Sequence, residues 1–346
     1  MTISLFIRSK LNPILTATDR WWESRAVFNP GAALYGDRIA LVYRAVGADG
    51  LSRLGIAWTR DGERIEERSE LPWYEAGIDD PMARLGIEDP RITRIEEDFY
   101  LTYCKASVEP AHTPKLSWET APFRIRSAVG VTRDFSGMRE VAVILPDTNT
   151  KDAVLFPEKI GARHAALIRE FPAIQLTYSH DLLGWSEPVP VLEPVPGTWE
   201  GERIGAGPPP IRTPWGWLLV YHANEYLRLP ENRRMYRMGL AVLDLGDPTR
   251  VLYRHPEPIF SPEAPYELAG PVGNVVFGTG LIESNEHFLL YYGAGDGVIG
   301  VAYAEKEWIF RIVGGGGDQH SRAVRAVYKR RACALRPYEP TLRAKS

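Results

Sequence analysis

The sequence predicts an all-β fold, a five-bladed β-propeller with a central funnel. The first observation is that an apolar strand, followed by a second strand that ends near Asp or Gly, recurs five times. The second is that short runs rich in Val, Ile, Tyr and Leu are separated by Gly, Pro, Asp and Asn clusters, as turns require. The third is that no long stretch shows the period of an amphipathic helix. Self-similarity of this kind is typical of repeat folds, and paired short strands favour propeller blades.

The repeats follow one another in order along the chain. Their first strands are expected at 39–46, 99–106, 164–171, 216–223 and 287–294. Their second strands are expected at 54–62, 128–137, 174–185, 238–248 and 298–305. Because blades around an axis bring strand ends together in a funnel, we expect the functional side chains there.

The predicted domain organisation is one propeller with a tail. Residues 1–308 are expected to form the catalytic propeller. Residues 309–346 are Gly-rich and basic, and we expect either disorder or a short helix there. The polar segments 108–124 and 224–235 are interpreted as rim loops that read the substrate.

Composition excludes several classes of protein. A net charge of −3 over 346 residues argues against binding of nucleic acid or an anionic membrane. Neither a signal peptide nor a membrane span is evident, so a cytoplasmic protein is expected. Cys104 and Cys333 have no metal-ligand spacing and are too few for a disulfide framework. Cys104 lies in an apolar strand pattern and is expected to be free and buried.

Charged and amide side chains next to Gly or Pro at strand ends are the candidates for a site. Asn29 precedes Pro30, which is equally typical of a plain turn. Arg44 ends an apolar strand and needs an anionic or hydrogen-bonding partner, from the fold or from a ligand. Asp89 precedes Pro90, which restricts the backbone and so sets the direction of its side chain.

A second group of candidates is basic. Lys151, Arg169, Arg203 and His222 could supply four donors to one anion, and phosphate suits such a group. His222, at a strand end, is also compatible with a structural role. The triple proline that follows Arg203 makes its loop stiff, which favours a site-forming backbone.

These clusters, in this order, resemble glycoside hydrolase family 130, the β-mannoside phosphorylases and related enzymes. The resemblance runs from about Asn12 to Glu305 and rests on FNPGA, LVYRA, GIEDPRI, KDAVLFPEKI, RIGAGPPPIRT, YHA, YRMGLAVLDLGDP, YELAGPVGNVVF and YYGAGD. It implies a five-bladed propeller and inverting phosphorolysis of β-mannosides with release of α-mannose 1-phosphate. The implied substrates are short β-1,4-mannooligosaccharides, mannosyl-GlcNAc or mannosyl-glucose. It implies no metal or organic cofactor, with inorganic phosphate as co-substrate.

The resemblance also assigns residues by position. It makes Asp89 the catalytic acid, a task for which a raised pKa is expected. It places the mannosyl ring on Asn29, Arg44 and Asp296. It places phosphate on Lys151, Arg169, Arg203 and His222. The strand ALIREFP and the arginine at 203 depart from the family pattern, which bears on phosphate affinity and acceptor choice.

Two other functions stay open at this stage. A β-mannosidase hydrolase on the same scaffold would need a second carboxylate, for which Glu158 and Asp152 are the candidates. A non-catalytic carbohydrate-binding propeller would have no need of an acid at Asp89. The expected partners are a small oligosaccharide and phosphate, with neither nucleic acid nor membrane, and a homo-oligomer is possible.

Overall fold

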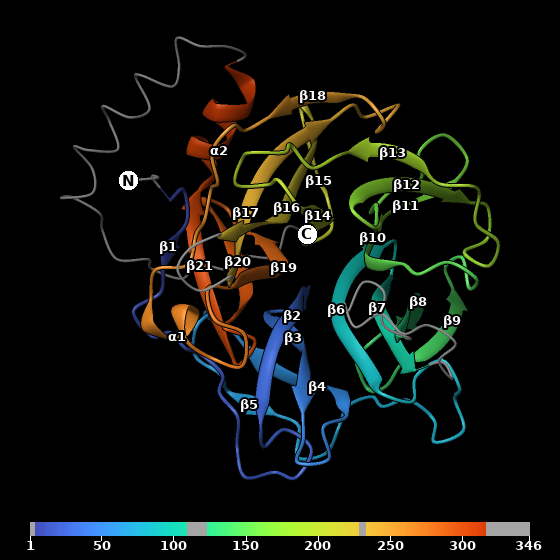
Figure 1. Cartoon of the computed structure of the whole chain (residues 1–346), viewed down its shortest axis with the longest axis vertical. Helices are drawn as coiled ribbons and strands as arrows, with labels where there is room; N and C mark the ends of the chain where they lie inside the picture. The colour runs from blue at the N-terminus through green and yellow to red at the C-terminus, as the bar shows by residue number, and fades with distance from the viewer. Residues whose placement is uncertain (1–3, 109–122, 228–232, 316–346) are drawn as a thin grey trace.

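The computed structural model describes residues 4–108, 123–227 and 233–315. Within these ranges it contains 21 strands and two short helices, so the predicted all-β class is confirmed. The strands form five antiparallel blades arranged as a ring, with β2, β6, β10, β14 and β19 nearest the centre (Figure 1). This is a five-bladed β-propeller.

The blades follow one another along the chain. Blade one consists of β2 (Ala26–Tyr35), β3 (Arg38–Val46), β4 (Ser52–Thr59) and β5 (Glu67–Arg68). Blade two consists of β6 (Gly86–Ile95), β7 (Asp98–Val108), β8 (Phe123–Thr132) and β9 (Arg139–Val143). Blade three consists of β10 (Lys151–Leu155), β11 (His164–Glu170), β12 (Ala173–Ser179) and β13 (Val189–Leu192). Blades one and two are joined by a single parallel pair, Ser52 with Gly86.

Blade four has a divided inner strand. It consists of β14 (Arg203–Ala206), β15 (Ile211–Thr213), β16 (Gly216–Leu227), β17 (Arg233–Leu243) and β18 (Val251–Arg254). Both β14 and β15 pair with β16, and the triple proline lies between them. Proline has no N–H to donate to a sheet ladder, so it interrupts the strand there.

Blade five is built from both ends of the described chain. It consists of β19 (Val276–Glu283), β20 (His287–Ala294), β21 (Val298–Glu305) and β1 (Ile7–Arg8), with β1 pairing on β21. The Arg8 guanidinium reaches Glu267 in the short helix α1 (Pro265–Leu268) at 2.7 Å. Glu267 is fully buried and also accepts a hydrogen bond from Tyr292. The N-terminal strand therefore closes the ring with a buried ion pair.

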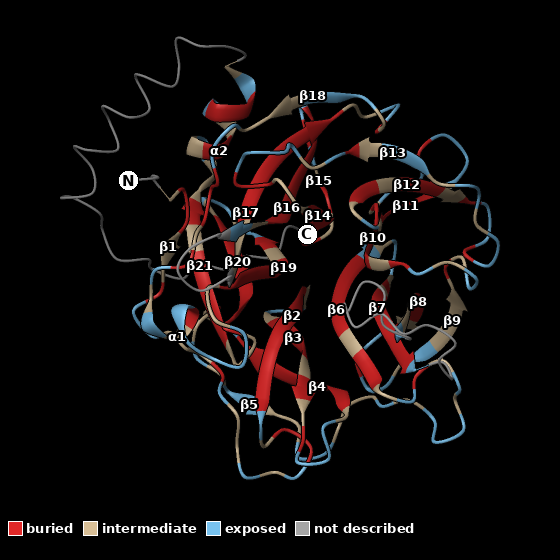
Figure 2. Ribbon diagram, viewed as in Figure 1, coloured by how far each residue is buried: buried red, intermediate tan, exposed pale blue. Residues whose placement is uncertain are grey.

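Each pair of neighbouring blades shares an apolar core. On β16, Trp217, Leu219 and Tyr221 pack with residues of blade three. The alternate residues Leu218 and Val220 pack with residues of blade five. Because both faces of such a strand are covered, it is apolar at almost every position. Figure 2 shows this burial along the strands, with exposed residues mainly in the connections.

The predicted tail begins in ordered structure. Helix α2 (Lys306–Gly314) crosses the predicted boundary at residue 308, and Ile309, Ile312 and Val313 join the core shared by blades four and five. Residues 316–346 lie outside the described residues, so the basic tail stays a prediction. The same holds for most of the rim loop 108–124 and for residues 228–232 of the second. Cys104 is free and buried, as predicted.

Candidate active site

Three inner strands carry the same backbone irregularity. Asn29, Asp89 and Asp152 have φ values of 50°, 51° and 57°, in the left-handed region. Each lies where the inner strand shifts register against its neighbour. Asn and Asp tolerate this conformation better than other side chains with a Cβ. A bulge redirects a side chain, so the same device in blades one, two and three presents three polar groups at the axis.

Asp89 is the centre of a first cluster, which we call the Asp89 cluster: Asn29, Arg44, Glu88, Asp89 and Lys151. Asp89 is buried, and its Oδ1 accepts hydrogen bonds from Asn29 Nδ2 at 2.8 Å and Arg44 Nη1 at 3.3 Å. Its Oδ2 lies 3.0 Å from Lys151 Nζ. Glu88 contacts the same two cations, at 2.8 Å from Arg44 Nη2 and 3.2 Å from Lys151 Nζ. Two carboxylates and two cations therefore balance one another.

This balance fixes the charge of Asp89. Burial alone would raise the pKa of its carboxyl, but Lys151, Arg44 and Arg91, with the hydrogen bond from Asn29, hold that pKa well below its usual range. Burial alone would lower the pKa of Lys151, but Asp89 and Glu88 outweigh this effect and raise that pKa above its usual value. The expected raised pKa of Asp89 is therefore wrong, because the sequence did not reveal how many cations surround this carboxyl.

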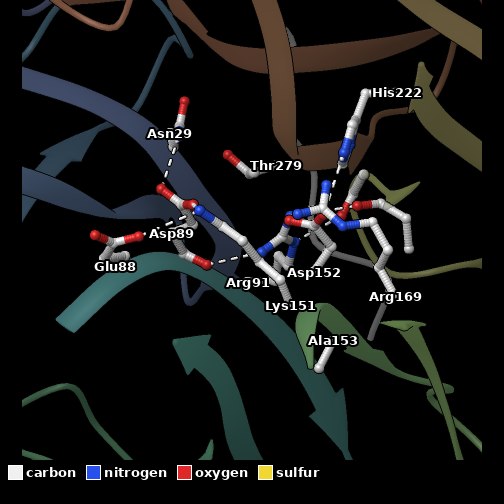
Figure 3. Close-up of polar contacts among 12 residues, drawn as sticks. Asn29, Glu88, Asp89, Arg91, Lys151, Asp152, Ala153, Arg169, His222 and Thr279 are labelled. Carbon is white, nitrogen blue, oxygen red and sulfur yellow. Dashed lines mark hydrogen bonds and ion pairs between the residues drawn. The ribbon is translucent and has the colours of Figure 1, made fainter. Parts of the chain in front are cut away.

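Asp152 is the centre of a second cluster, the Asp152 cluster: Arg91, Asp152, Arg169 and His222 (Figure 3). Its Oδ1 lies 2.9 Å from Arg91 Nη2, and its Oδ2 lies 2.7 Å from Arg169 Nη1 and 3.2 Å from His222 Nε2. Although burial would raise the pKa of Asp152, its three partners hold it well below the usual range. Asp152 is a permanent anion that orients three groups from three blades.

Arg91 connects the two clusters. Its side chain is buried, and it donates to the backbone oxygens of Asp89 at 2.9 Å and Gly207 at 3.1 Å as well as to Asp152. Gly205 is required beside it because a Cβ there would lie 2.5 Å from both Asp152 Oδ2 and His222 Nε2. Small size at that position lets the histidine of β16 reach the axis across β14.

His222 is neutral in this environment. Burial lowers the pKa of its imidazole to about 4, although Asp152 acts in the opposite direction. Because Nε2 faces a carboxylate, we assign the proton to Nε2. The other ring nitrogen, Nδ1, is then an acceptor, and it is buried without a hydrogen-bond partner.

Arg203 completes a positively charged region next to these clusters. It is buried, and its guanidinium donates to the Tyr236 hydroxyl. Burial lowers its pKa, and the nearby Arg169 and Arg234 lower it further. We call the region around Arg169, Arg203 and His222 the anion pocket. Arg91 and Arg169 both contact Asp152, and Arg203 is close enough to Arg169 for the two guanidiniums to interact electrostatically.

Asp296 lies close enough to the Asp89 cluster to interact electrostatically with Arg44 and Asp89. It occupies the turn between β20 and β21 with φ 51°. Burial raises the pKa of its carboxyl to about 6; Arg44 counteracts this, and Asp89 reinforces it. Blade five approaches Asn29 so closely that a Cβ at Gly293 would lie 2.0 Å from Asn29 Oδ1.

The structure thus gathers all eight predicted site residues around the axis, but in different surroundings. Lys151 contacts Asp89 and Glu88, and His222 contacts Asp152, whereas Arg169 and Arg203 border the anion pocket. Sequence reasoning missed Arg91, and it did not recognise that Asp152 holds Arg91, Arg169 and His222 in place. The repeats could have indicated this role, because Asp152 occupies the same position in its blade as Asn29 and Asp89 occupy in theirs. Among the described residues, no group of His, Cys, Asp or Glu is arranged to hold a metal ion.

A buried aspartate beside several basic side chains, at the axis of a five-bladed propeller, is suited to the class of enzymes that cleave glycosidic bonds with an acid and an anion. Comparison with known proteins places the chain within that class. The sequence profile of glycoside hydrolase family 130, described as beta-1,4-mannooligosaccharide phosphorylase, matches residues 12–314. The chain belongs to this family and is a glycoside phosphorylase.

Three relatives are informative. The chain is 34% identical over 299 residues to a 1,2-beta-oligomannan phosphorylase of Thermoanaerobacter sp. (strain X514), covering 84% of this chain and 94% of the relative. It is 36% identical over 309 residues to a beta-1,2-mannobiose phosphorylase of the same organism, covering 85% and 95%. The structure of the Listeria innocua beta-1,2-mannobiose phosphorylase with beta-1,2-mannobiose has a TM-score of 0.75 at 26% identity, covering 89% of this chain and 99% of that one. Homologues of the chain are therefore β-mannoside phosphorylases.

Membrane insertion through a helix has no support in the described residues, since no helix there is long and apolar enough to span a bilayer.

Proposed function

We propose that this enzyme cleaves short β-1,2-linked mannosides by inverting phosphorolysis and releases α-mannose 1-phosphate. The observation that carries the reaction type is the gathering of Arg169, Arg203 and His222 in the anion pocket, next to the cluster of the buried Asp89. Guanidinium groups bind oxyanions through charge-assisted hydrogen bonds, so a dianion is a suitable guest for this region. Inorganic phosphate is such a dianion and is the co-substrate of a phosphorylase.

The proposed roles follow from the contacts. A phosphate oxygen held by Arg169 and Arg203 attacks the anomeric carbon, the glycosidic C–O bond breaks, and a proton passes from Asp89 to the departing oxygen. Asn29, Arg44 and Asp296 would hold the mannosyl ring around that carboxyl. Lys151 lies between the two regions, because its strand partner is Arg169 and its ammonium contacts Asp89. His222 would offer phosphate its Nδ1 as an acceptor.

The low pKa of Asp89 sets a condition on this mechanism. The carboxyl must gain a proton before it acts as an acid. A phosphate dianion near Lys151 would offset part of the positive charge that keeps Asp89 ionised, and would so raise its pKa. Phosphate would therefore act both as nucleophile and as the charge that prepares the acid.

The linkage is inferred from the relatives rather than from the site. The two relatives named above at 34% and 36% identity act on β-1,2-linked mannosides. A β-1,4-mannooligosaccharide phosphorylase of Ruminococcus albus is 29% identical. The β-1,4 linkage expected from the sequence resemblance therefore has weaker support than the β-1,2 linkage.

Hydrolysis is the second candidate function. One structural neighbour, with a TM-score of 0.78 at 24% identity, is associated with family members that are glycoside hydrolases targeting β-1,2 mannosidic linkages, and a likeness of this level shows the fold alone. Neither carboxylate considered for a hydrolytic base is suitably placed. Asp152 is held by three partners, and Glu158 is half exposed and pairs with Arg212 at 3.4 Å.

The test is turnover of β-1,2-mannobiose, β-1,4-mannobiose and mannosyl-GlcNAc with and without inorganic phosphate, with products identified by ³¹P and ¹H NMR. Phosphate-dependent formation of α-mannose 1-phosphate, fastest with the β-1,2 disaccharide, is expected. Free mannose formed at a rate indifferent to phosphate would instead establish hydrolysis. Preference for β-1,4-mannobiose would refute the proposed linkage but leave phosphorolysis standing.

A further inference from the structure

One buried amide in blade four has no partner within the protein. Asn224 on β16 is fully buried, and neither its Nδ2 nor its Oδ1 makes a hydrogen bond. Buried side-chain amides are almost always satisfied, because an unpaired polar group loses its hydration without compensation. An amide with both ends unsatisfied therefore calls for a guest that supplies an acceptor and a donor together.

The sheet register places this amide in the anion pocket. Asn224 is paired with Arg203 on β14 and with Tyr236 on β17. Residues directly opposite each other in antiparallel strands present their side chains on the same face, so the three form one row. His222 is two residues earlier on the same strand and therefore shares that face. The hydrogen bond from Arg203 to Tyr236 spans the row in which the amide lies.

The donors and acceptors of the anion pocket restrict which molecule can bind there. Arg169 and Arg203 donate hydrogen bonds and accept none. Asn224 Oδ1 and His222 Nδ1 are two buried acceptors without a hydrogen-bond partner. A guest that satisfies both kinds of group has several acceptor oxygens and at least one hydrogen. Monohydrogen phosphate has both, whereas sulfate, of similar shape and charge, has no hydrogen at neutral pH.

We infer that Asn224 is a phosphate ligand, with Nδ2 donating to a phosphate oxygen and Oδ1 accepting the P–O–H hydrogen, so that the pocket selects monohydrogen phosphate over sulfate. This inference rests on the proposed phosphorolysis and adds a specificity-determining residue to it. Fixing the hydroxyl oxygen of phosphate on the amide leaves the unprotonated oxygens for the arginines and for attack on the sugar.

The test is isothermal titration of the whole protein with inorganic phosphate and with sulfate. Asn224→Leu keeps the approximate volume and removes both hydrogen-bonding ends. We expect it to weaken phosphate binding about tenfold or more, the usual effect of losing a hydrogen bond to a charged group. Sulfate, which uses only the donor end, should be weakened less, so the preference for phosphate over sulfate falls. Asn224→Asp should weaken phosphate further, because a carboxylate there would pair with Arg203 and repel the dianion.

The control for Asn224→Asp is Asn285→Asp, the same chemical change at an exposed site in the turn between β19 and β20. It should leave the dissociation constants for phosphate and sulfate unchanged. Thermal unfolding of each variant checks that it folds, and Asn224→Ser, which keeps a smaller donor and acceptor, should give an intermediate phosphate constant. A folded Asn224→Leu variant whose dissociation constant for phosphate is within twofold of wild type would overturn the inference. Formation of mannose 1-phosphate by wild type would still uphold the proposed function in that case. Wild-type protein that binds no phosphate and forms no mannose 1-phosphate would overturn both.

Discussion

Replacing Asp152 by asparagine tests whether one buried carboxylate organises the anion pocket. The change is nearly isosteric, but it removes the negative charge between Arg91, Arg169 and His222, whose nitrogens lie 2.9, 2.7 and 3.2 Å from the two carboxylate oxygens. Removing one partner of a buried ion pair typically costs about 3–5 kcal/mol, because the remaining charge is left uncompensated. The asparagine oxygen still accepts one hydrogen bond, so we expect the lower end, about 3 kcal/mol.

The assay is thermal and denaturant unfolding with and without phosphate. At about 2.1 cal/mol/K per residue, the unfolding entropy of a chain of 346 residues converts this loss into a decrease of about 4 °C in Tm. Saturating phosphate should raise the Tm of Asp152→Asn by more degrees than it raises the Tm of wild type, because the anion replaces the missing negative charge. Asp79→Asn, the same change on an exposed loop, should alter stability by less than about 0.5 kcal/mol. A Tm within about 1 °C of wild type for Asp152→Asn would refute the assignment of Asp152 as the anchor of the pocket.

Three further predictions concern neighbouring residues. Asp89→Asn should lower turnover by about 10²–10⁴-fold in a product assay while phosphate still binds in a titration, and undiminished turnover would exclude Asp89 as the acid. Asp296→Asn should be more stable than wild type at pH 7 by at most about 3 kcal/mol in urea unfolding, with the advantage gone near pH 4. The reason is that the pKa of Asp296, raised from 3.8 to about 6, makes wild type lose stability as pH rises through that interval. Gly205→Ala should lower the free energy of unfolding by about 1–3 kcal/mol and weaken phosphate binding in the same titration, because its Cβ would overlap Asp152 and His222. A stability and a phosphate affinity equal to those of wild type would contradict the packing described.

The blade pattern was predictable because the middle strands are covered on both faces. The apolar runs at 39–46 and 216–223 coincide with β3 and β16, each the second strand of its blade outward from the axis. The inner strands were harder to recognise because bulges, prolines and polar residues interrupt their apolar pattern. In blade four the inner strand is even divided into β14 and β15. The features that hide an inner strand from pattern analysis are those that build the site.

Which residues approach the axis was also predictable, but their pairing was not. Asp89 and Lys151 were recognised as separate candidates, one an acid and the other a phosphate ligand, yet they form an ion pair of 3.0 Å. Pairing depends on register shifts between strands more than sixty residues apart, which local sequence patterns do not contain. Asn224 was overlooked for a related reason. The sequence placed it in the predicted rim loop 224–235, whereas it lies within β16, beside strands that carry Arg203 and Tyr236.

The pairing of β1 with β21 has a consequence for how the protein is made. Arg8 and its buried partner Glu267 are 259 residues apart, so the ring stays open until most of the chain has left the ribosome. At synthesis rates of about 5–20 residues per second, that interval is on the order of tens of seconds. During this time the earlier blades can pair locally, while the first strand waits without a partner. Final closure is thus a late, long-range event of the kind that makes folding slow, and until β1 pairs with β21 the edges of these two strands are open to pairing with another copy of the chain.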